Sequence, residues 1–193
     1  MHFIHSKMMC WVALDRASKL ARSGQIPDRR LRLWEREAEA IRTFVEGRGW
    51  SEAKRSYVRS AGSADLDASL LMAVLLGYDD PSSERLQATV RAIRTELGKG
   101  PLLFRYTGED GLGGSEGFFL ACSFWLVDAL ARLGHIDEAA ESMEALLAFA
   151  NDVGLYAEEV ELETGEFLGN FPQALVHLAL INAAASISEQ QRR

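Results

Sequence analysis

Apolar residues along the chain recur every three or four positions, which is the period of an α-helix. The repeats form separate segments that end at Gly or begin near Pro or Ser, the residues that mark helix ends. The clearest pattern, at 28–46, sets an apolar stripe against a face rich in Arg and Glu. The expected helices cover 6–21, 28–46, 66–76, 83–97, 118–133, 137–150 and 172–187. Since no strand pattern recurs at the spacing of β-α-β units, we expect an all-α fold.

The expected helices fall into two classes, according to how much of their surface is apolar. Some are apolar nearly all round and are expected to be buried on most sides: 66–76, 118–133 and 172–187. Others carry one apolar stripe and a charged face: 28–46, 83–97 and 137–150. Because the two classes alternate along the chain, we expect an inner and an outer layer of helices. In that arrangement the loops at one end of the inner layer converge on a cleft.

The segment 154–171, GLYAEEVELETGEFLGNF, is too long for a plain connection between two helices. Its apolar residues alternate with acids, and burying them would favour an ordered loop over a disordered one. Glu158 and Glu159 are adjacent carboxylates in this segment. A carboxylate held against apolar surface can serve as a general base, so Glu158 is a catalytic candidate. A solvated surface position for Glu158 is the alternative.

Arg105 lies inside a short apolar segment, 102–106, that we expect to be extended. It is followed by Tyr106 and, shortly afterwards, by Glu109 and Asp110. The guanidinium group offers a rigid fork of donors that suits hydroxyl or carboxylate groups. The residues fit a binding role for Arg105 and a structural salt bridge equally well.

The glycine-rich run 113–117 contains Ser115 in the pattern G-x-S-x-G. In serine hydrolases that pattern needs a strand leading into the serine and a parallel sheet around it, whereas the residues before Gly113 are polar and turn-like. We keep a Ser115 hydrolase, with His135 or His177 as base, only as a minor hypothesis. The favoured interpretation is a glycine-rich entry into a buried helix, where the backbone passes close to a neighbour or a ligand.

Composition narrows the classes of function. The chain has 193 residues, 48% of them hydrophobic, which is enough for one domain covering 1–193 with a sizeable core. The net charge is −7 and the densest basic cluster is the short stretch 28–32, which argues against a nucleic-acid groove. No apolar run reaches 18 residues, and charges occupy the place of a signal-peptide cleavage site, so we expect a cytoplasmic protein with no membrane span.

The cysteines and histidines do not form a metal-binding pattern. Cys10 and Cys122 have no C-x-x-C spacing and lie in apolar helical segments, so we expect both to be buried, reduced thiols. The four histidines lack the spacing of zinc sites, and His177 fits a hydrogen-bonded core histidine. We therefore expect neither a metal nor a cofactor.

Four segments resemble the bacterial branch of glycoside hydrolase family 15, which includes glucoamylase-like and trehalase-like enzymes. They occur in the family's order and span nearly the whole chain: HFIHSKMMCWVALDRA, LDASLL, GLGGSEGFFLACSFWLVDAL and NDVGLYAEEVELETGEFLGNFPQALVHLALINAA. The resemblance implies an (α/α)6 barrel of two concentric helix rings and an inverting mechanism that uses two glutamates. It also implies an oligosaccharide or disaccharide substrate with α-glucosidic bonds, such as glucan ends or trehalose.

The resemblance assigns roles to particular residues. Glu158 corresponds to the family's general base, and Arg105 to an arginine that binds sugar hydroxyls, with Glu109 or Asp110 close by. Glu116 would border the same pocket. In an inverting enzyme the acid and the base stand roughly 6.5 to 9.5 Å apart, on opposite sides of the scissile bond.

One family feature has no counterpart in this sequence. The family's general acid lies in a Trp-Glu motif just before the segment that begins HFIHSK here, and that motif, the first half of the barrel and the family's β-sandwich domain are not found. We therefore expect about half of a barrel that keeps the base but is inactive alone. Its open flank would favour homo-oligomers or a partner chain. The alternative function is a non-catalytic helical interaction module.

Overall fold

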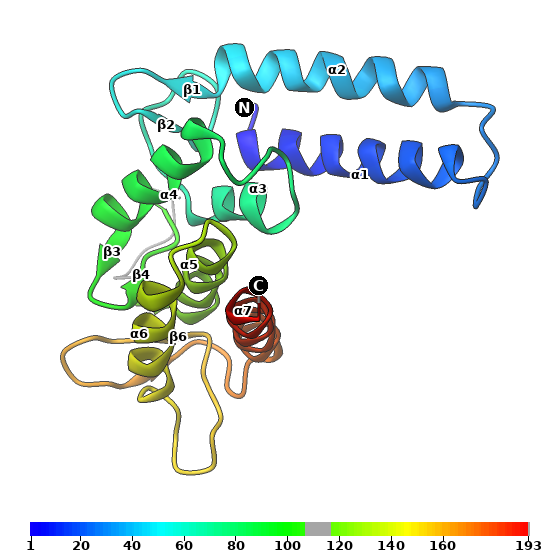
Figure 1. Ribbon diagram of the computed structural model, residues 1–193. Coiled ribbons are helices and arrows are strands. Elements are labelled where there is room, and N and C mark those ends of the chain that lie inside the picture. The colour runs from blue at the N-terminus through cyan, green and yellow to red at the C-terminus, as the bar shows by residue number, and fades with distance from the viewer. Residues whose placement is uncertain (107–116, 193) are drawn as a thin grey trace.

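The computed structural model describes residues 1–106 and 117–192, and within them it has seven α-helices and a few short strands. Helices α1 (Ile4–Arg22) and α2 (Leu31–Arg48) lie side by side as a long arm (Figure 1). The remaining helices form a body around α5 (Leu120–Arg132), which contacts α6 (Ile136–Leu147) and α7 (Ala174–Gln191). The expected all-α class is confirmed.

The two expected classes of helix occupy different layers. Helix α5 is buried along almost its whole length, and Phe124 and Ala129 at its centre are fully inaccessible to solvent. An apolar surface all round requires neighbours on all sides, and α5 therefore has an inner position. Helices α4 (Glu84–Leu97) and α6 bury one stripe each, and α2 buries Val45 while the rest of its stripe is half-buried. All three expose their charged faces. The alternation of inner and outer helices is confirmed.

The expected helix at 66–76 is shorter than its apolar pattern suggests. It begins as a single 3-10 turn, η1 (Ala68–Leu71), and continues as α3 (Met72–Leu75). The Asp67 carboxylate accepts a hydrogen bond from the Ser69 N–H at 2.8 Å and so fixes the start after Asp67. Gly77, with φ of +65°, ends the segment in a conformation that favours glycine.

Seven short strands make three small sheets within the described residues. Strands β1 (Trp50–Ser51) and β2 (Ser56–Tyr57) pair, as do β3 (Gly98–Lys99) and β4 (Leu102–Leu103). The third sheet joins β5 (Phe118–Phe119), β6 (Glu159–Val160) and β7 (Phe167–Leu168), all antiparallel. The apolar pattern assigned Phe118 and Phe119 to a helix, but they pair with the loop after α6 instead.

The prediction that Cys10 is buried is wrong, whereas Cys122 is buried as expected and both thiols are free. Helix α1 turns Ile4, Met8 and Val12 toward the protein. Cys10 lies on the opposite side of α1, where no other described helix covers it.

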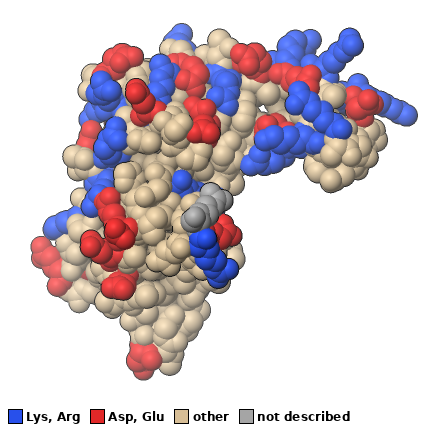
Figure 2. All heavy atoms as spheres, viewed as in Figure 1, with Lys and Arg blue, Asp and Glu red and all other residues tan. Residues whose placement is uncertain are grey.

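Helix α7 also has an uncovered apolar side. Its surface is apolar nearly all round, but its main contacts are with α5 and α6. Leu175, Leu178 and Ile181 are 43%, 59% and 59% exposed. Helix α7 lies at the edge of the body in Figure 1, so this face is not covered by the described chain. Figure 2 shows charges of both signs along the arm and on the body, and a largely uncharged surface at the lower end of the body.

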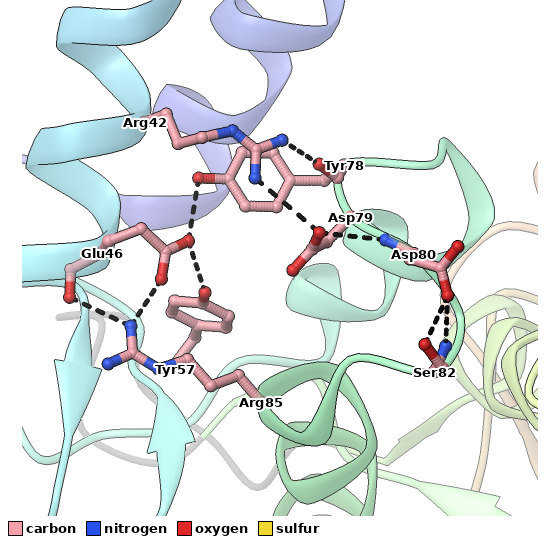
Figure 3. Close-up of polar contacts among 8 residues, drawn as sticks. All are labelled: Arg42, Glu46, Tyr57, Tyr78, Asp79, Asp80, Ser82 and Arg85. Carbon is pink, nitrogen blue, oxygen red and sulfur yellow. Dashed lines mark hydrogen bonds and ion pairs between the residues drawn. The ribbon is translucent and has the colours of Figure 1, made fainter.

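A carboxylate on α2 joins the arm to the body (Figure 3). Glu46 Oε1 accepts hydrogen bonds from the buried hydroxyls of Tyr57 at 2.7 Å and Tyr78 at 3.4 Å. Glu46 Oε2 accepts one from Arg85 of α4 at 2.5 Å. Arg42 adds a bond to the Tyr78 carbonyl oxygen. This Glu46 network connects α2, β2, α4 and the turn after α3.

Candidate functional site

The loops that carry the predicted site residues meet the N-terminal ends of three helices. Each of these helix starts donates a backbone N–H to one loop carbonyl: Ile4 to Arg59 at 3.0 Å, Ala68 to Arg105 at 2.7 Å and Leu120 to Glu158 at 3.1 Å. These bonds satisfy N–H groups that have no partner within a helix. They also hold Arg59, Arg105 and Glu158 beside the N-terminal ends of these helices, where the helix dipole is positive.

Glu158 is half-buried and its carboxylate is held on one side only. Its Oε2 accepts hydrogen bonds from the Asn170 backbone N–H at 3.1 Å and from Asn170 Nδ2 at 2.8 Å. Within residues 1–106 and 117–192, no hydrogen bond reaches Oε1. The carboxylate is thus fixed through one oxygen, and the second has lone pairs available to a water molecule.

Glu159 points to the other face of the sheet. It pairs with Phe119 on β5 and with Leu168 on β7. Directly paired residues in antiparallel strands share a face, and consecutive residues point to opposite faces. Glu159 Oε2 accepts a hydrogen bond from the Gly117 N–H at 2.9 Å. The neighbouring glutamates therefore have separate surroundings, and Glu159 has a partner in the backbone.

Arg105 lies on the Glu159 side of this sheet. Its guanidinium carbon is 5.3 Å from the centroid of the Phe119 ring and 5.0 Å from that of Tyr106. Both distances allow a cation–π contact. The Arg105 Nη2 donates to the Tyr106 hydroxyl at 3.2 Å. Of the hydrogen bonds and ion pairs found in the described chain, none joins Arg105 to Glu158, so the two predicted residues share an end of the molecule without direct contact.

The buried thiol of Cys122 lies close to several charged side chains. Burial raises the pKa of its thiol, and the negative charge of Asp67 raises it further. The positive charge of Arg105 lowers the same pKa, and Glu159 raises it. Asp67, Arg105 and Glu159 are therefore close enough to act on one buried sulfur. A neutral, inert thiol is expected under these conditions.

Three of the predicted binding residues, Glu109, Asp110 and Glu116, lie outside the described residues, as does Ser115. Their proposed roles remain predictions from the sequence. His177 agrees with its interpretation as a hydrogen-bonded histidine, because its Nδ1 lies 2.8 Å from the Gln173 carbonyl oxygen. The edge of its ring also meets the buried Tyr156.

Sequence reasoning missed Arg59 and Asp67, which lie next to Tyr106, and His5, which feels the charge of Asp67. The Arg59 guanidinium carbon is 3.9 Å from the centroid of the Tyr106 ring, and its Nε is 3.9 Å from Asp67 Oδ2. Burial lowers the pKa of His5, while the charge of Asp67 opposes that shift. The spacing of Asp67 and Ser69 is a helix-cap signal that could have identified Asp67. Arg59 carries no local signal, because its partners are distant in sequence.

Membrane-spanning helices and clusters of metal-binding side chains are both absent from the described residues. None of its helices has the length and apolar character needed to cross a membrane. Across residues 1–106 and 117–192, no group of three or more His, Cys, Asp or Glu residues is placed to hold a metal ion.

The sequence matches known proteins along nearly its whole length. The family model described as glycosyl hydrolases family 15 matches residues 1–142 and 131–185. A trehalase of Mycolicibacterium smegmatis is 48% identical over 189 residues, covering 96% of this chain and 28% of that protein. A trehalase of Thermoplasma acidophilum is 37% identical and covers 97% of this chain and 32% of that protein. The chain thus spans less than a third of the length of these relatives.

Solved structures share the fold. A glycosidase variant in complex with glucose matches with a TM-score of 0.82 and 19% identity, covering 97% of this chain and 52% of that chain. A bacterial glucoamylase complexed with acarbose matches with a TM-score of 0.81 and 18% identity, covering 97% and 34%. These matches confirm the expectation of part of an (α/α)6 barrel. Together with the family match and the identity to trehalases, they show that this chain belongs to glycosyl hydrolase family 15.

Proposed function

We propose that this chain supplies the water-activating half of a glycoside hydrolase site, with Glu158 as the general base. The observation that carries the proposal is the bonding of Glu158: one carboxylate oxygen is held by Asn170, and the other accepts no hydrogen bond from the described chain. A general base needs a fixed position and an oxygen with a free lone pair. Glu159 meets this description less well, because a single backbone N–H, that of Gly117, holds its carboxylate, whereas two donors hold that of Glu158.

The proposed reaction inverts the configuration of the sugar. Glu158 takes a proton from water while the water oxygen bonds to the anomeric carbon. The bond from that carbon to the leaving oxygen breaks, and a general acid protonates the leaving oxygen. We assign the acid to polypeptide beyond this chain, because the relatives are more than three times as long. On this proposal residues 1–193 are one portion of an (α/α)6 catalytic domain.

The proposed sugar-binding residues are Arg105, Glu109, Asp110 and Glu116. For Arg105, support comes from its half-buried position and its contacts with two aromatic rings, which limit the motion of the guanidinium group. The planar fork of donors on a guanidinium group suits the hydroxyls of a sugar. The substrate class is a disaccharide or oligosaccharide with an α-glucosidic bond. Trehalose is the first candidate, because relatives at 48% and 37% identity are trehalases.

A chimera tests the proposal. This chain replaces the matching segment of the Mycolicibacterium smegmatis trehalase, and released glucose is measured with trehalose as substrate. The chimera should be active, and Glu158→Gln should lower kcat by about 10²- to 10⁴-fold, the usual contribution of a general base. Undiminished turnover by Glu158→Gln would rule out the assignment. The 193-residue chain alone should release no glucose from trehalose, maltose or isomaltose, and turnover there would disprove the need for an external acid.

A second candidate function is a non-catalytic interaction module. The exposed apolar face of α7, made by Leu175, Leu178 and Ile181, favours it. Such a module would form homo-oligomers or bind a partner chain through this face. Light scattering of the eluting chain at several concentrations tests it: Leu178→Ser with Ile181→Ser should shift any oligomer toward monomer. A chain that is monomeric at every concentration would count against self-association.

A further inference from the structure

Asn170 makes three hydrogen bonds to a single residue, Glu158. Its carbonyl oxygen accepts the Glu158 backbone N–H at 2.9 Å, just beyond the paired residues of β6 and β7. Its own N–H and its Nδ2–H both donate to Glu158 Oε2. Two donors of different origin, one backbone and one side chain, therefore converge on one carboxylate oxygen.

Gly169 lies directly against the same carboxylate. Its φ is +73°, in the left-handed region that favours glycine. A Cβ added at this position would lie 2.9 Å from Glu158 Oε2 and 3.0 Å from Glu158 Cβ. Real Cβ atoms do not approach so closely, so any side chain at 169 would displace the carboxylate. Glycine and asparagine are thus each required here by a contact with Glu158.

The backbone around these residues is anchored at both ends. Before Glu158, Tyr156 is buried and packs edge-on against Phe124. After Asn170, the Gln173 N–H donates to the Tyr156 carbonyl oxygen at 2.9 Å. The segment that carries the donors and the segment that carries the carboxylate are therefore tied to the same point. The relative position of Asn170 and Glu158 is fixed by the fold.

We propose that Gly169 and Asn170 form a clamp that positions the Glu158 carboxylate for catalysis. This inference rests on the proposed function of Glu158. The clamp holds Oε2 and so directs Oε1 toward the place where the reacting water sits. A free glutamate side chain samples several rotamers, and fixing one of them in advance removes that entropy loss from the reaction. Asn170 is a positioning residue, because it acts on the substrate only through Glu158.

The active chimera described above allows the clamp to be tested by kinetics. Asn170→Ala removes the side-chain donor, and Asn170→Asp keeps its size while replacing the donor with an acceptor. Both should lower kcat by about 10- to 100-fold, because a small displacement of a reacting group has effects of that size. KM should stay within about twofold, since the base contributes to the transition state and not to substrate binding.

Asn151→Ala is the matched control. Asn151 Oδ1 accepts backbone N–H bonds from Val153 and Leu155, at the other end of the same loop. Its loss should lower the melting temperature without changing kcat, whereas Asn170→Asp should change kcat whatever it does to the melting temperature. Glu158→Gln is run in parallel. If it abolishes turnover while both Asn170 variants keep the original kcat, or change only KM, the clamp is wrong and the base assignment stands. If Glu158→Gln keeps full turnover, the proposed function is wrong.

Discussion

Glu46 and Glu158 are both partly buried glutamates, but their carboxylates are bonded in contrasting ways. Both oxygens of Glu46 accept hydrogen bonds, from two tyrosine hydroxyls and from Arg85. In Glu158 the described residues bond only Oε2, and Asn170 supplies both donors. A carboxylate with both oxygens occupied joins elements of the fold and has little capacity left for a substrate. One with a single oxygen occupied is held in place and still able to accept a proton.

The contrast separates a structural site from a candidate catalytic site by local bonding. The Glu46 network joins α2 to α4 and β2, elements that are distant in sequence. The Glu158 contacts lie within one hairpin at the N-terminal end of α5. Disturbing the first should therefore affect stability, whereas disturbing the second should affect turnover.

The largest effect on stability should appear at alkaline pH. Burial is the main cause that raises the pKa of Tyr57, and its hydrogen bond to Glu46 raises it further. Burial also raises the pKa of Tyr78, and the charge of Glu46 adds to that shift. Below about pH 10 both states keep these protons; above it the unfolded chain releases them and the folded chain does not. Each tyrosine then lowers the unfolding free energy of the protein by about 1.4 kcal/mol per pH unit. Urea unfolding at pH 9 and pH 11 measures this loss of unfolding free energy. Tyr57→Phe should make the loss smaller, and a Tyr57→Phe variant with the same pH dependence as the original chain would contradict the prediction.

Removing the Glu46 carboxylate should have the next largest effect. Glu46→Ala leaves two tyrosine hydroxyls and Arg85 without their acceptor, which should lower the unfolding free energy by about 2 kcal/mol. The value is below that of a fully buried pair because the Arg85 and Glu46 side chains keep 39% and 32% of their exposure. Chemical denaturation of the 193-residue chain checks this. Glu158→Ala, the comparison variant, should change stability by less than about 0.5 kcal/mol. Equal losses would remove the distinction.

A smaller effect is expected at acidic pH near the candidate site. Burial lowers the pKa of His5, and Asp67 only partly opposes this. Below the ordinary histidine pKa of about 6.5, the unfolded chain binds a proton that the folded chain resists. Stability should therefore decrease as the pH falls from 7 to 5, by less than about 1 kcal/mol because His5 is only half-buried. Melting temperatures across this range, compared with those of His5→Gln, test the effect; identical slopes would exclude it.

Local patterns predicted the helices well, and contacts across the chain account for the differences. The stripe of α2 and the apolar surface of α5 appear in consecutive residues, so both helices were expected. The burial of Cys10 was predicted wrongly because an apolar pattern does not reveal which side of a helix has a neighbour. The start of η1 depended on one cap, Asp67.

The candidate site shows the same limit. Glu158 and Arg105 were selected from the sequence, and the helix starts bring them to one end of the molecule. That Glu159, and not Glu158, shares a face with Phe119 follows from strand register. Register joins residues about 40 positions apart, which the sequence pattern does not specify. The pairing of Glu158 with Asn170 depends on the same hairpin.

Chemical rescue is the most direct test of the central claim that Glu158 accepts a proton from water. Glu158→Ala in the chimera removes the base and leaves space beside the anomeric carbon, and azide can attack that carbon without deprotonation. We predict that azide restores turnover of trehalose and yields the β-glucosyl azide, whereas Glu159→Ala gains nothing from azide. Rescue of Glu159→Ala but not of Glu158→Ala, or an azide product of α configuration, would contradict the account.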